Sequence, residues 1–276
     1  KKKNILKSIH SEFQMPLPDI CPSCGNMKLL QQGYGTEKVQ EVLQKLNPDI
    51  RISRFDRDEI TTLTQLEDTL NAFHKGDISV LVGTQMLAKG HNFKRVNTVL
   101  VLGIDQQLNF PDFRALERTY QLLIQIAGRA GRFSEKAKVL IQTLSGEMPL
   151  FDYIRNHTFD DFYKDEITFR QELKIPPFAR IAIIYFHGGK RENVVNAAQS
   201  AKTFLLQCLR EIPAENKSIA GPAPAMIERK SSRYSWCLQI KCSDVVVLNR
   251  ALAIFYRNFK QKAVIIKIDV DPFLGF

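Results

Sequence analysis

The stretch QLLIQIAGRAGR, residues 121–132, decides how the fold is interpreted, because it ends a long predicted helix that begins near residue 113. Apolar residues recur at helical spacing on one side of this helix; they are Leu116, Tyr120, Leu123, Ile126 and Ala130. Gln125, Arg129 and Arg132 are spaced by four and then three residues, so they share another face. The helix is therefore predicted to pack against a core and to present two arginines away from it.

Short apolar runs on both sides of this helix predict β-strands, and they alternate with helical segments. The runs are IRISRFD (50–56), ISVLVGT (78–84), NTVLVLGID (97–105) and AKVLIQT (137–143), and further helices are predicted over 37–47 and 63–76. Continuous apolar runs such as 78–84 and 97–105 are typical of strands buried on both faces. Alternating strands and helices predict one doubly wound α/β domain with a parallel sheet, ending near Gly146.

The second half of the chain begins with an aromatic-rich helical segment, residues 148–173. Pro176 and Pro177 end this segment, because proline cannot continue a helix. The remaining residues alternate as a strand, a helix, two strands around a basic turn, a helix and a strand. This β-α-β-β-α-β order is that of ferredoxin-like domains, so the sequence predicts a smaller α+β domain.

Composition and charge limit the classes of function. The 276 residues are 44% hydrophobic, which is enough for two domains, and no apolar run is long enough to span a membrane. The formal net charge of +10 favours a polyanionic partner, with nucleic acid first and a membrane surface second. The basic first residues lack the apolar segment of a secretory signal, and an odd number of cysteines, five, argues against a disulfide framework. We therefore expect a cytoplasmic protein.

The arginines at the end of the long helix are candidates for binding phosphate, because a guanidinium group is planar, always charged and rich in donors. Placed on a γ-phosphate, such a group would stabilise the charge of the transferring phosphoryl group. Gly128 and Gly131 each cost a helix up to about 1 kcal/mol relative to alanine, which suggests close approach of another chain or a ligand. The alternative is a solvated amphipathic helix with surface arginines.

Polar residues follow two of the predicted strands. Thr84, Gln85 and Lys89 come at and after the end of the 78–84 run, and Asp105 ends the next run. Ligands bind beside the carboxyl ends of the strands in open α/β sheets. We therefore expect these side chains at a ligand-binding edge.

Several segments resemble a known family. GTQMLAKGHNF (83–93), the run 101–132 and KVLIQT (138–143) resemble motifs V and VI of superfamily 2 helicases and their surroundings. CPSCG, GYGTEKVQEVL, FDRD, KIPPFAR, GPAPA and IDVDP resemble, in the same order, segments of the primosomal protein N′ family of replication-restart helicases. The resemblance extends from about Cys21 to the C-terminal end.

The resemblance implies the second RecA-like lobe of a helicase that uses ATP with Mg²⁺ to unwind DNA at stalled forks. ATP in such enzymes lies between two lobes, and Arg129 and Arg132 match the motif VI arginines that reach its phosphates. Further positions implied at the nucleotide site are Gln125, Gly128, Gly83, Gly90 and Asp105. Thr84 and Lys89 match motif V, which touches DNA, and Gln85 lies between them. The implied partners are forked or single-stranded DNA, primosome proteins and single-strand-binding proteins.

Two sequences that such enzymes need for ATP binding are absent from the chain: a G-x-x-x-x-G-K-[ST] phosphate loop and a D-E-x-H sequence. We therefore expect no ATP hydrolysis by the chain alone, and a nucleotide site completed by an absent first lobe. The alternatives are a non-catalytic DNA- or partner-binding protein and a decayed remnant of the helicase. An upstream reading frame encoding the first lobe would instead indicate one part of a working split enzyme.

Cys21 and Cys24 form a C-x-x-C pair of the kind that binds zinc when two pairs are present. The resemblance implies two zinc ions, but SIHSE (8–12) stands where another pair is expected. His10 would supply a third ligand, so zinc binding is predicted only with an incomplete ligand set. The alternative is a turn with two free thiols.

A basic turn in the second domain places Arg229, Lys230 and Arg233 beside Tyr234 and Trp236. Cations interleaved with aromatic residues suit contact with a nucleic-acid backbone together with base stacking. We predict that the three cations contact DNA and that Trp236 folds back on the core. The remaining cysteines are predicted to be small core residues; they are Cys208, Cys237 and Cys242.

The predicted organisation has four parts. Residues 1–27 are interpreted as a remnant of a cysteine-rich zinc-binding region, and 28–146 as the second helicase lobe. Residues 147–174 form a helical connector, and 175–276 form the α+β C-terminal domain.

Overall fold

The computed structural model describes residues 5–7, 14–16, 18, 20, 25, 35–56, 59–84, 87, 96–130, 137–210, 217–230 and 232–272. The chain divides into two compact units. The α/β unit consists of residues 30–110 and 114–162, and the C-terminal unit consists of residues 1–29, 111–113 and 163–276. In the C-terminal unit, a short antiparallel hairpin is formed by β1 (Ile5–Lys7) and β2 (Gln14–Pro16).

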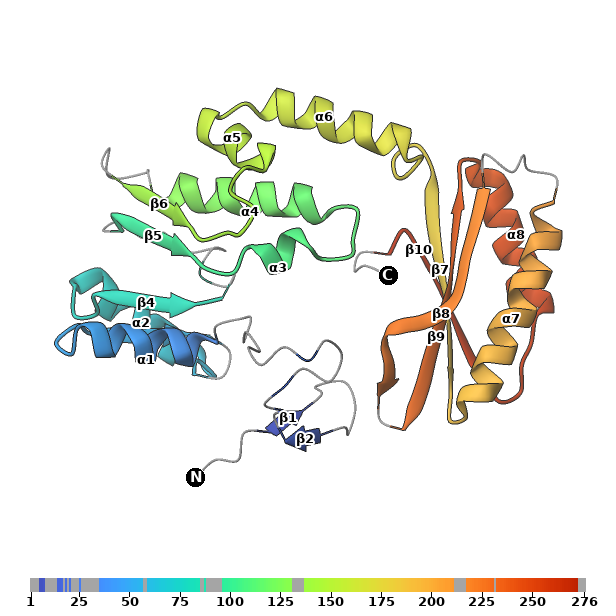
Figure 1. Ribbon diagram of the computed structural model, residues 1–276, viewed down its shortest axis with the longest axis horizontal. Helices are drawn as coiled ribbons and strands as arrows, with labels where there is room; N and C mark the ends of the chain where they lie inside the picture. The colour runs from blue at the N-terminus through green and yellow to red at the C-terminus, as the bar shows by residue number, and fades with distance from the viewer. Residues whose placement is uncertain are drawn as a thin grey trace. The chain divides into compact units, whose positions relative to one another are not determined.

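Strands and helices alternate in the α/β unit as the sequence predicts (Figure 1). The strands are β3 (Ile52–Phe55), β4 (Val80–Gly83), β5 (Thr98–Val101) and β6 (Lys138–Ile141), and the helices are α1 (Thr36–Leu46), α2 (Leu63–Lys75), α3 (Asp105–Leu108), α4 (Ala115–Ala130) and α5 (Pro149–Asn156). Parallel pairs join β3 to β4 and β5 to β6. The prediction of one continuous sheet is wrong for the described residues, which form two separate parallel pairs.

The prediction that the 97–105 run is buried on both faces is also wrong. Exposed and half-buried residues alternate along β5 and β6. Leu100 and Leu140 are directly paired across the two strands, and they are 55% and 52% exposed. Because Val101 and Ile141 pack toward the core formed with α4, their leucine neighbours point to the opposite, uncovered face.

Local sequence signals fix the ends of α2. The Thr62 hydroxyl accepts a hydrogen bond from the Gln65 backbone N–H at 3.2 Å, and the Gln65 side chain accepts one from the Thr62 backbone N–H at the same distance. Such a reciprocal pair satisfies two backbone donors that a helix start leaves open. Gly76 caps the C-terminal end with a φ of 89°, so the helix ends where the sequence predicts.

The core of the α/β unit lies between α4 and the helices that follow β6. Its buried members come from the residue that precedes α3, from α4 and α5, and from the start of α6 (Phe159–Glu172); they are Ile104, Tyr120, Leu123, Leu150, Phe151, Ile154 and Phe162. The rings of Tyr120 and Phe162 stack at a centroid distance of 4.3 Å and an angle of 4°. The segment predicted as a connector therefore contributes, through α5 and the first turn of α6, to the same core as α4.

The C-terminal unit contains a four-stranded antiparallel sheet in the order β10-β7-β9-β8. Its elements are β7 (Arg180–Gly188), α7 (Arg191–Cys208), β8 (Lys217–Lys230), β9 (Arg233–Cys242), α8 (Val245–Asn258) and β10 (Ile265–Val270). They follow each other in the predicted β-α-β-β-α-β order. Figure 1 shows α7 and α8 on the same face of the sheet, which leaves the other face without a helix of this domain.

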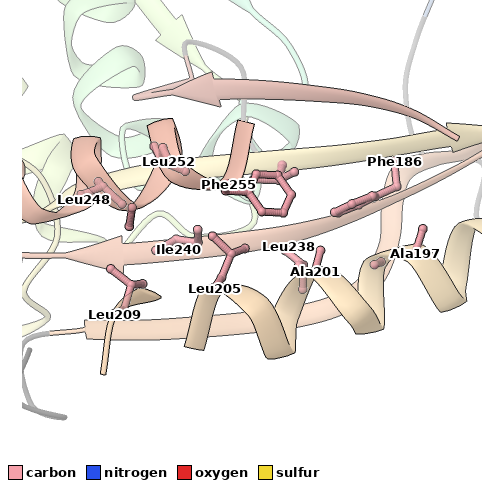
Figure 2. Packing of buried hydrophobic residues seen from close by; sticks show 14 of the residues in the cluster. Phe186, Ala197, Ala201, Leu205, Leu209, Leu238, Ile240, Leu248, Leu252 and Phe255 are labelled. Atoms are coloured by element: carbon pink, nitrogen blue, oxygen red, sulfur yellow. The ribbon is translucent and has the colours of Figure 1, made fainter. Parts of the chain in front are cut away.

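The core of this sheet lies between its strands and the two helices, where Figure 2 shows Phe186, Leu238 and Phe255 meeting. Cys242 is fully buried in this core and Cys208 packs against it, as predicted, and burial raises the pKa of both thiols. The prediction is wrong for Cys237, which is half-buried and lies on the other face of β9, because side chains alternate along a strand. Trp236 also packs against it, which confirms the prediction that its ring folds back on the core. Buried apolar area of this kind is the main stabilising contribution to such a domain.

Candidate phosphate and nucleic-acid sites

Helix α4 separates a buried face from an exposed one, as its sequence predicts. Tyr120 and Leu123 are 5% and 1% exposed and form part of the core. Thr119 is fully buried, and its hydroxyl donates to the Ala115 carbonyl at 2.7 Å, so burial leaves this group hydrogen-bonded. Gln125 is exposed on the outer side of the helix. The exposed side is therefore the side on which a bound phosphate would meet the helix.

The two predicted catalytic arginines differ in how far the structure describes them. Arg129 lies within α4, one helical turn after Gln125, so these two positions share a face of the helix. Arg132 lies outside the described residues, which resume at 137. The role of both as phosphate ligands stays a prediction.

Gly128 is exposed on α4, and a Cβ built on it would meet no atom of the described chain within 4 Å, the local helix backbone aside. Gly128 lies inside the regular helix α4 with a negative φ, so no left-handed backbone conformation requires a glycine there. No packing contact within the described chain therefore accounts for a glycine here. A ligand or a further chain approaching the helix would account for it.

Gly128→Ala is expected to raise the free energy of unfolding of the α/β unit by about 0.5–1 kcal/mol, because alanine is the better helix former and fits without a clash. Chemical denaturation followed by circular dichroism measures this change. Gly146→Ala is the matched control, since Gly146 is also open but lies outside any helix, and a smaller change is expected there. A loss of stability in Gly128→Ala would contradict the open environment of this position.

The end of β4 holds two of the predicted site residues. A Cβ on Gly83 would lie 2.5 Å from the Phe55 carbonyl oxygen and 2.7 Å from Leu87 Cδ1. Gly83 is thus required by the close pairing of β4 with β3, and its place at the nucleotide site stays a prediction. Thr84 is exposed at the carboxyl end of β4, where a parallel sheet binds ligands. The neighbouring predicted residues Gln85, Lys89 and Gly90 lie outside the described residues.

Asp105, predicted at the nucleotide site, has partners within the α/β unit. One carboxylate oxygen accepts from the Thr143 hydroxyl at 2.8 Å, and both oxygens accept from the Leu144 backbone N–H at 3.1 and 3.2 Å. These bonds tie the start of α3 to the segment after β6. Asp105 therefore positions the loops at this edge of the sheet, a role that sequence reasoning did not predict.

Asp56, at the carboxyl end of β3, is a second structural carboxylate that sequence reasoning missed. It is 6% exposed and accepts from the Thr36 hydroxyl at 2.5 Å and from the Glu59 backbone N–H at 3.0 Å. The Arg54 guanidinium lies 4.0 Å from the Asp56 carboxylate and forms an ion pair with Glu59. The network joins β3 to the first residue of α1. The FDRD sequence contained the signal, because an aspartate directly after a strand often caps the following turn.

The basic turn of the C-terminal unit connects β8 and β9, and its cationic side chains lie on both faces of the sheet. Arg229 pairs with Tyr234, and its guanidinium lies 5.3 Å from the centroid of that ring. Lys230 pairs with Arg233, so these two cations share the opposite face. All three predicted DNA-contacting cations are exposed, but the sheet separates Arg229 from the other two.

No metal centre can be assigned within the described residues, because no group of three or more His, Cys, Asp or Glu side chains there could hold an ion. Cys21 and Cys24, the predicted zinc ligands, lie outside the described residues. Within the described part of the chain, no helix is long and apolar enough to cross a membrane.

Comparison with protein-family models gives two matches. Residues 28–134 match the helicase conserved C-terminal domain, and residues 171–273 match the primosomal protein N C-terminal domain. The first range contains the end of β4 and helix α4. The second contains the four-stranded sheet and its two helices.

Curated relatives resemble nearly the whole chain. The replication restart protein PriA of Bacillus subtilis is 34% identical over 98% of this chain and 33% of the relative. The protein of the same name from Synechocystis is 35% identical over 95% of this chain and 31% of the relative, and that from Haemophilus influenzae is 32% identical over 98% and 37%. The chain thus spans about a third of the length of these relatives. The two domain matches and this similarity show that the chain belongs to the PriA family of replication restart proteins and corresponds to a C-terminal portion of such a protein.

Proposed function

We propose that this chain supplies the second RecA-like lobe and the C-terminal domain of an ATP-dependent DNA helicase that acts in replication restart. The observation that carries the proposal is helix α4: its inner face is held by Tyr120 and Leu123, and its outer face presents Gln125 and the position of Arg129. In a chain that resembles PriA proteins over nearly its whole length, this outer face is the one suited to a nucleotide phosphate.

Arg129 and Arg132 are the residues proposed to act on ATP. Their guanidinium groups would donate to the phosphate oxygens and stabilise the negative charge that spreads over the transferring group. The chain has no G-x-x-x-x-G-K-[ST] sequence, so residues outside it would hold the phosphates. Mg²⁺ is assigned to none of the described residues, because none of them form a suitable cluster.

DNA is the proposed nucleic-acid partner, in forked or single-stranded form. Thr84, with Gln85 and Lys89 beyond it, would contact the DNA backbone at the edge of the α/β unit. Arg229, Lys230 and Arg233 would contact it at the C-terminal unit, and the net charge of +10 of the whole chain favours a polyanionic partner. Primosome proteins and single-strand-binding proteins are proposed as protein partners, in the cytoplasm.

Two finer proposals concern the fold and zinc. The antiparallel order β10-β7-β9-β8 with both helices on one face supports a ferredoxin-like fold for the C-terminal domain. Cys21 and Cys24 are proposed as zinc ligands only in combination with two further donors, since structural zinc needs four. The pair alone does not fit a zinc ion, and no role of zinc is derived from it.

The test is DNA-stimulated ATP hydrolysis, measured for this chain alone and for a longer protein in which a lobe with a phosphate loop precedes it. We expect no turnover by the chain alone and DNA-stimulated turnover by the longer protein. Turnover by the chain alone that is lost in Arg129→Ala would overturn the proposed division of the ATP site. DNA binding without ATP hydrolysis by the longer protein would favour the alternative that the chain has a non-catalytic, DNA-binding function.

A further inference from the structure

The side chains of strand β7 lie alternately on the two faces of the C-terminal sheet. Ala182, Ile184 and Phe186 are fully buried in the core beneath α7 and α8. Tyr185 and His187, at the intervening positions, therefore lie on the helix-free face. Their rings are nearly parallel, with an angle of 11° and a centroid distance of 6.0 Å. The central region of this face thus carries two adjacent aromatic rings.

Neighbouring strands hold these two rings in place. His187 pairs with Ser235 on β9, and His187 Nδ1 lies 2.7 Å from the Ser235 Oγ, which forms a hydrogen bond with it. Tyr185 pairs with Lys267 on β10, and His187 pairs with Ile265 on the same strand. Ile265 is 57% exposed, so this end of the face is open.

Cations on the neighbouring strands share this face with the rings. Lys267 pairs with Tyr185, and Arg233 lies two residues before Ser235 on β9, so both cations share the face of His187. Both lower the pKa of His187, after the larger effect of burial. Lys230 is paired directly with Arg233 across the hairpin. Like charges placed opposite each other destabilise a sheet. A cost of this kind is offset when an anion binds between or beside the two cations.

Burial favours the neutral form of both rings. Burial is the main cause that lowers the pKa of His187 and raises that of Tyr185; the Cys237 thiol and then Asp269 raise the pKa of Tyr185 further. Asp269 lies beyond Lys267 on β10, toward the buried end of the face. Neutral rings next to cations offer π-faces for bases and charges for phosphates, which is the combination that binds single-stranded nucleic acid.

The other end of the same face is covered. Ile181 and Ile183 are 2% and 1% exposed. Lys241, which pairs with Ile181, donates to the Leu173 carbonyl at 2.9 Å, just after α6 ends. The accessible part of the face is therefore the region of the half-buried Tyr185 and His187 and of the exposed Lys230, Arg233 and Lys267.

We propose that this open region, called the stacking face and formed by Tyr185, His187, Lys230, Arg233 and Lys267, binds single-stranded DNA through base stacking. Four-stranded sheets with exposed aromatic residues on a central strand are used in this way by single-strand-binding modules. A duplex would not fit the same chemistry, because its base faces are covered by their neighbours. The inference rests on the proposed function in taking DNA as the ligand, and it assigns the stacking to Tyr185 and His187, not to Tyr234 and Trp236.

The test compares two double variants of the full chain that differ only in aromaticity. Tyr185→Leu with His187→Leu removes both rings, whereas Tyr185→Phe with His187→Phe keeps an aromatic ring at each position. Both double variants lose the hydrogen bond between His187 and Ser235. Binding is measured by fluorescence anisotropy with an oligothymidylate of about 20 nucleotides, its duplex with oligoadenylate, and an abasic oligomer of equal length. Tyr256→Leu is the matched control, because Tyr256 is 65% exposed on α8 and belongs to the helix-covered side of the sheet.

The leucine variant is expected to bind oligothymidylate about 5- to 100-fold more weakly than the native chain, while the phenylalanine variant and Tyr256→Leu bind within about twofold. The abasic oligomer is expected to bind weakly to all four proteins. Equal binding of the native chain and the leucine variant would overturn the stacking face while leaving the proposed helicase function intact. Equal binding of duplex and oligothymidylate, or no binding at all, would also overturn it, whereas the helicase function is tested separately by ATP hydrolysis.

Discussion

Arg129→Ala is expected to lower DNA-stimulated ATP hydrolysis by about 10³- to 10⁵-fold in a longer protein that contains this chain and a phosphate-binding lobe. An arginine that reaches a transferring phosphoryl group acts on the transition state, so the loss should fall on kcat and much less on the binding of ATP. Helix α4 supports this expectation, because its buried side is fixed by the core and Arg129 follows exposed Gln125 by one turn. Steady-state kinetics at saturating DNA measure the effect.

Arg129→Lys separates charge from geometry, because lysine keeps the charge but lacks the planar fork of donors. We expect it to recover only a small part of the lost rate. Arg250→Ala, at an exposed position of α8, is the control for the removal of a surface arginine and should leave kcat unchanged. An Arg129→Ala variant with native kcat and a raised KM would contradict a role in the transition state and would instead indicate simple nucleotide binding.

Local signals in the sequence were sufficient for most elements of both units, although β1, β2 and the short helix α3 were not predicted. The helical spacing of Tyr120 and Leu123 predicted which side of α4 is buried, and Gly76 predicted the end of α2. The β-α-β-β-α-β order of the C-terminal unit followed from the same kind of pattern. These features depend on residues that are close in sequence, and for that reason they can be predicted from one sequence.

Features that depend on distant pairing could not be predicted. The outward orientation of Leu100 on β5 and of Leu140 on β6 is not indicated by the sequence, because each leucine stands between two apolar residues and shows no alternation with polar ones. The partners of Asp105, which lie at residues 143–144, are joined to it only by the folding of the chain. The same holds for Tyr185, whose place on the helix-free face depends on the register of β7 with β9 and β10.

The residues proposed to contact DNA in the C-terminal unit could be predicted only in part, because their arrangement also depends on how the strands pair. The sequence indicated the cations Lys230 and Arg233, but it paired them with Tyr234, which lies on the other face of the sheet. Residues on adjacent strands share a face only when the register places them opposite each other. Sequence proximity in the hairpin therefore did not indicate that Tyr234 shares a face of the sheet with Arg229 and not with Lys230 and Arg233.

Tyr120→Ala is expected to lower the free energy of unfolding of the α/β unit by about 4 kcal/mol, because it removes a buried ring and leaves a cavity. The Tyr120 ring is 5% exposed and stacks on Phe162 at 4.3 Å, with Phe159 at 6.0 Å. It therefore joins α4 to α6 and holds the helix that carries Arg129. Denaturation followed by circular dichroism measures the loss, and Tyr256→Ala, at 65% exposure, should cost less than about 1 kcal/mol.

Tyr120→Phe tests the same ring without emptying the core. Burial raises the pKa of the Tyr120 hydroxyl above its ordinary value of 10.0, so the folded state holds this proton when the unfolded state has begun to lose it. The hydroxyl therefore contributes stability that is complete below pH 10.0 and is lost as the pH rises through the folded pKa. We expect Tyr120→Phe to keep most of the stability at pH 7 and to lose less of it than the native chain above pH 10.0. An alanine variant as stable as the phenylalanine variant would show that α4 is not held by this ring, and Arg129 would then need another support.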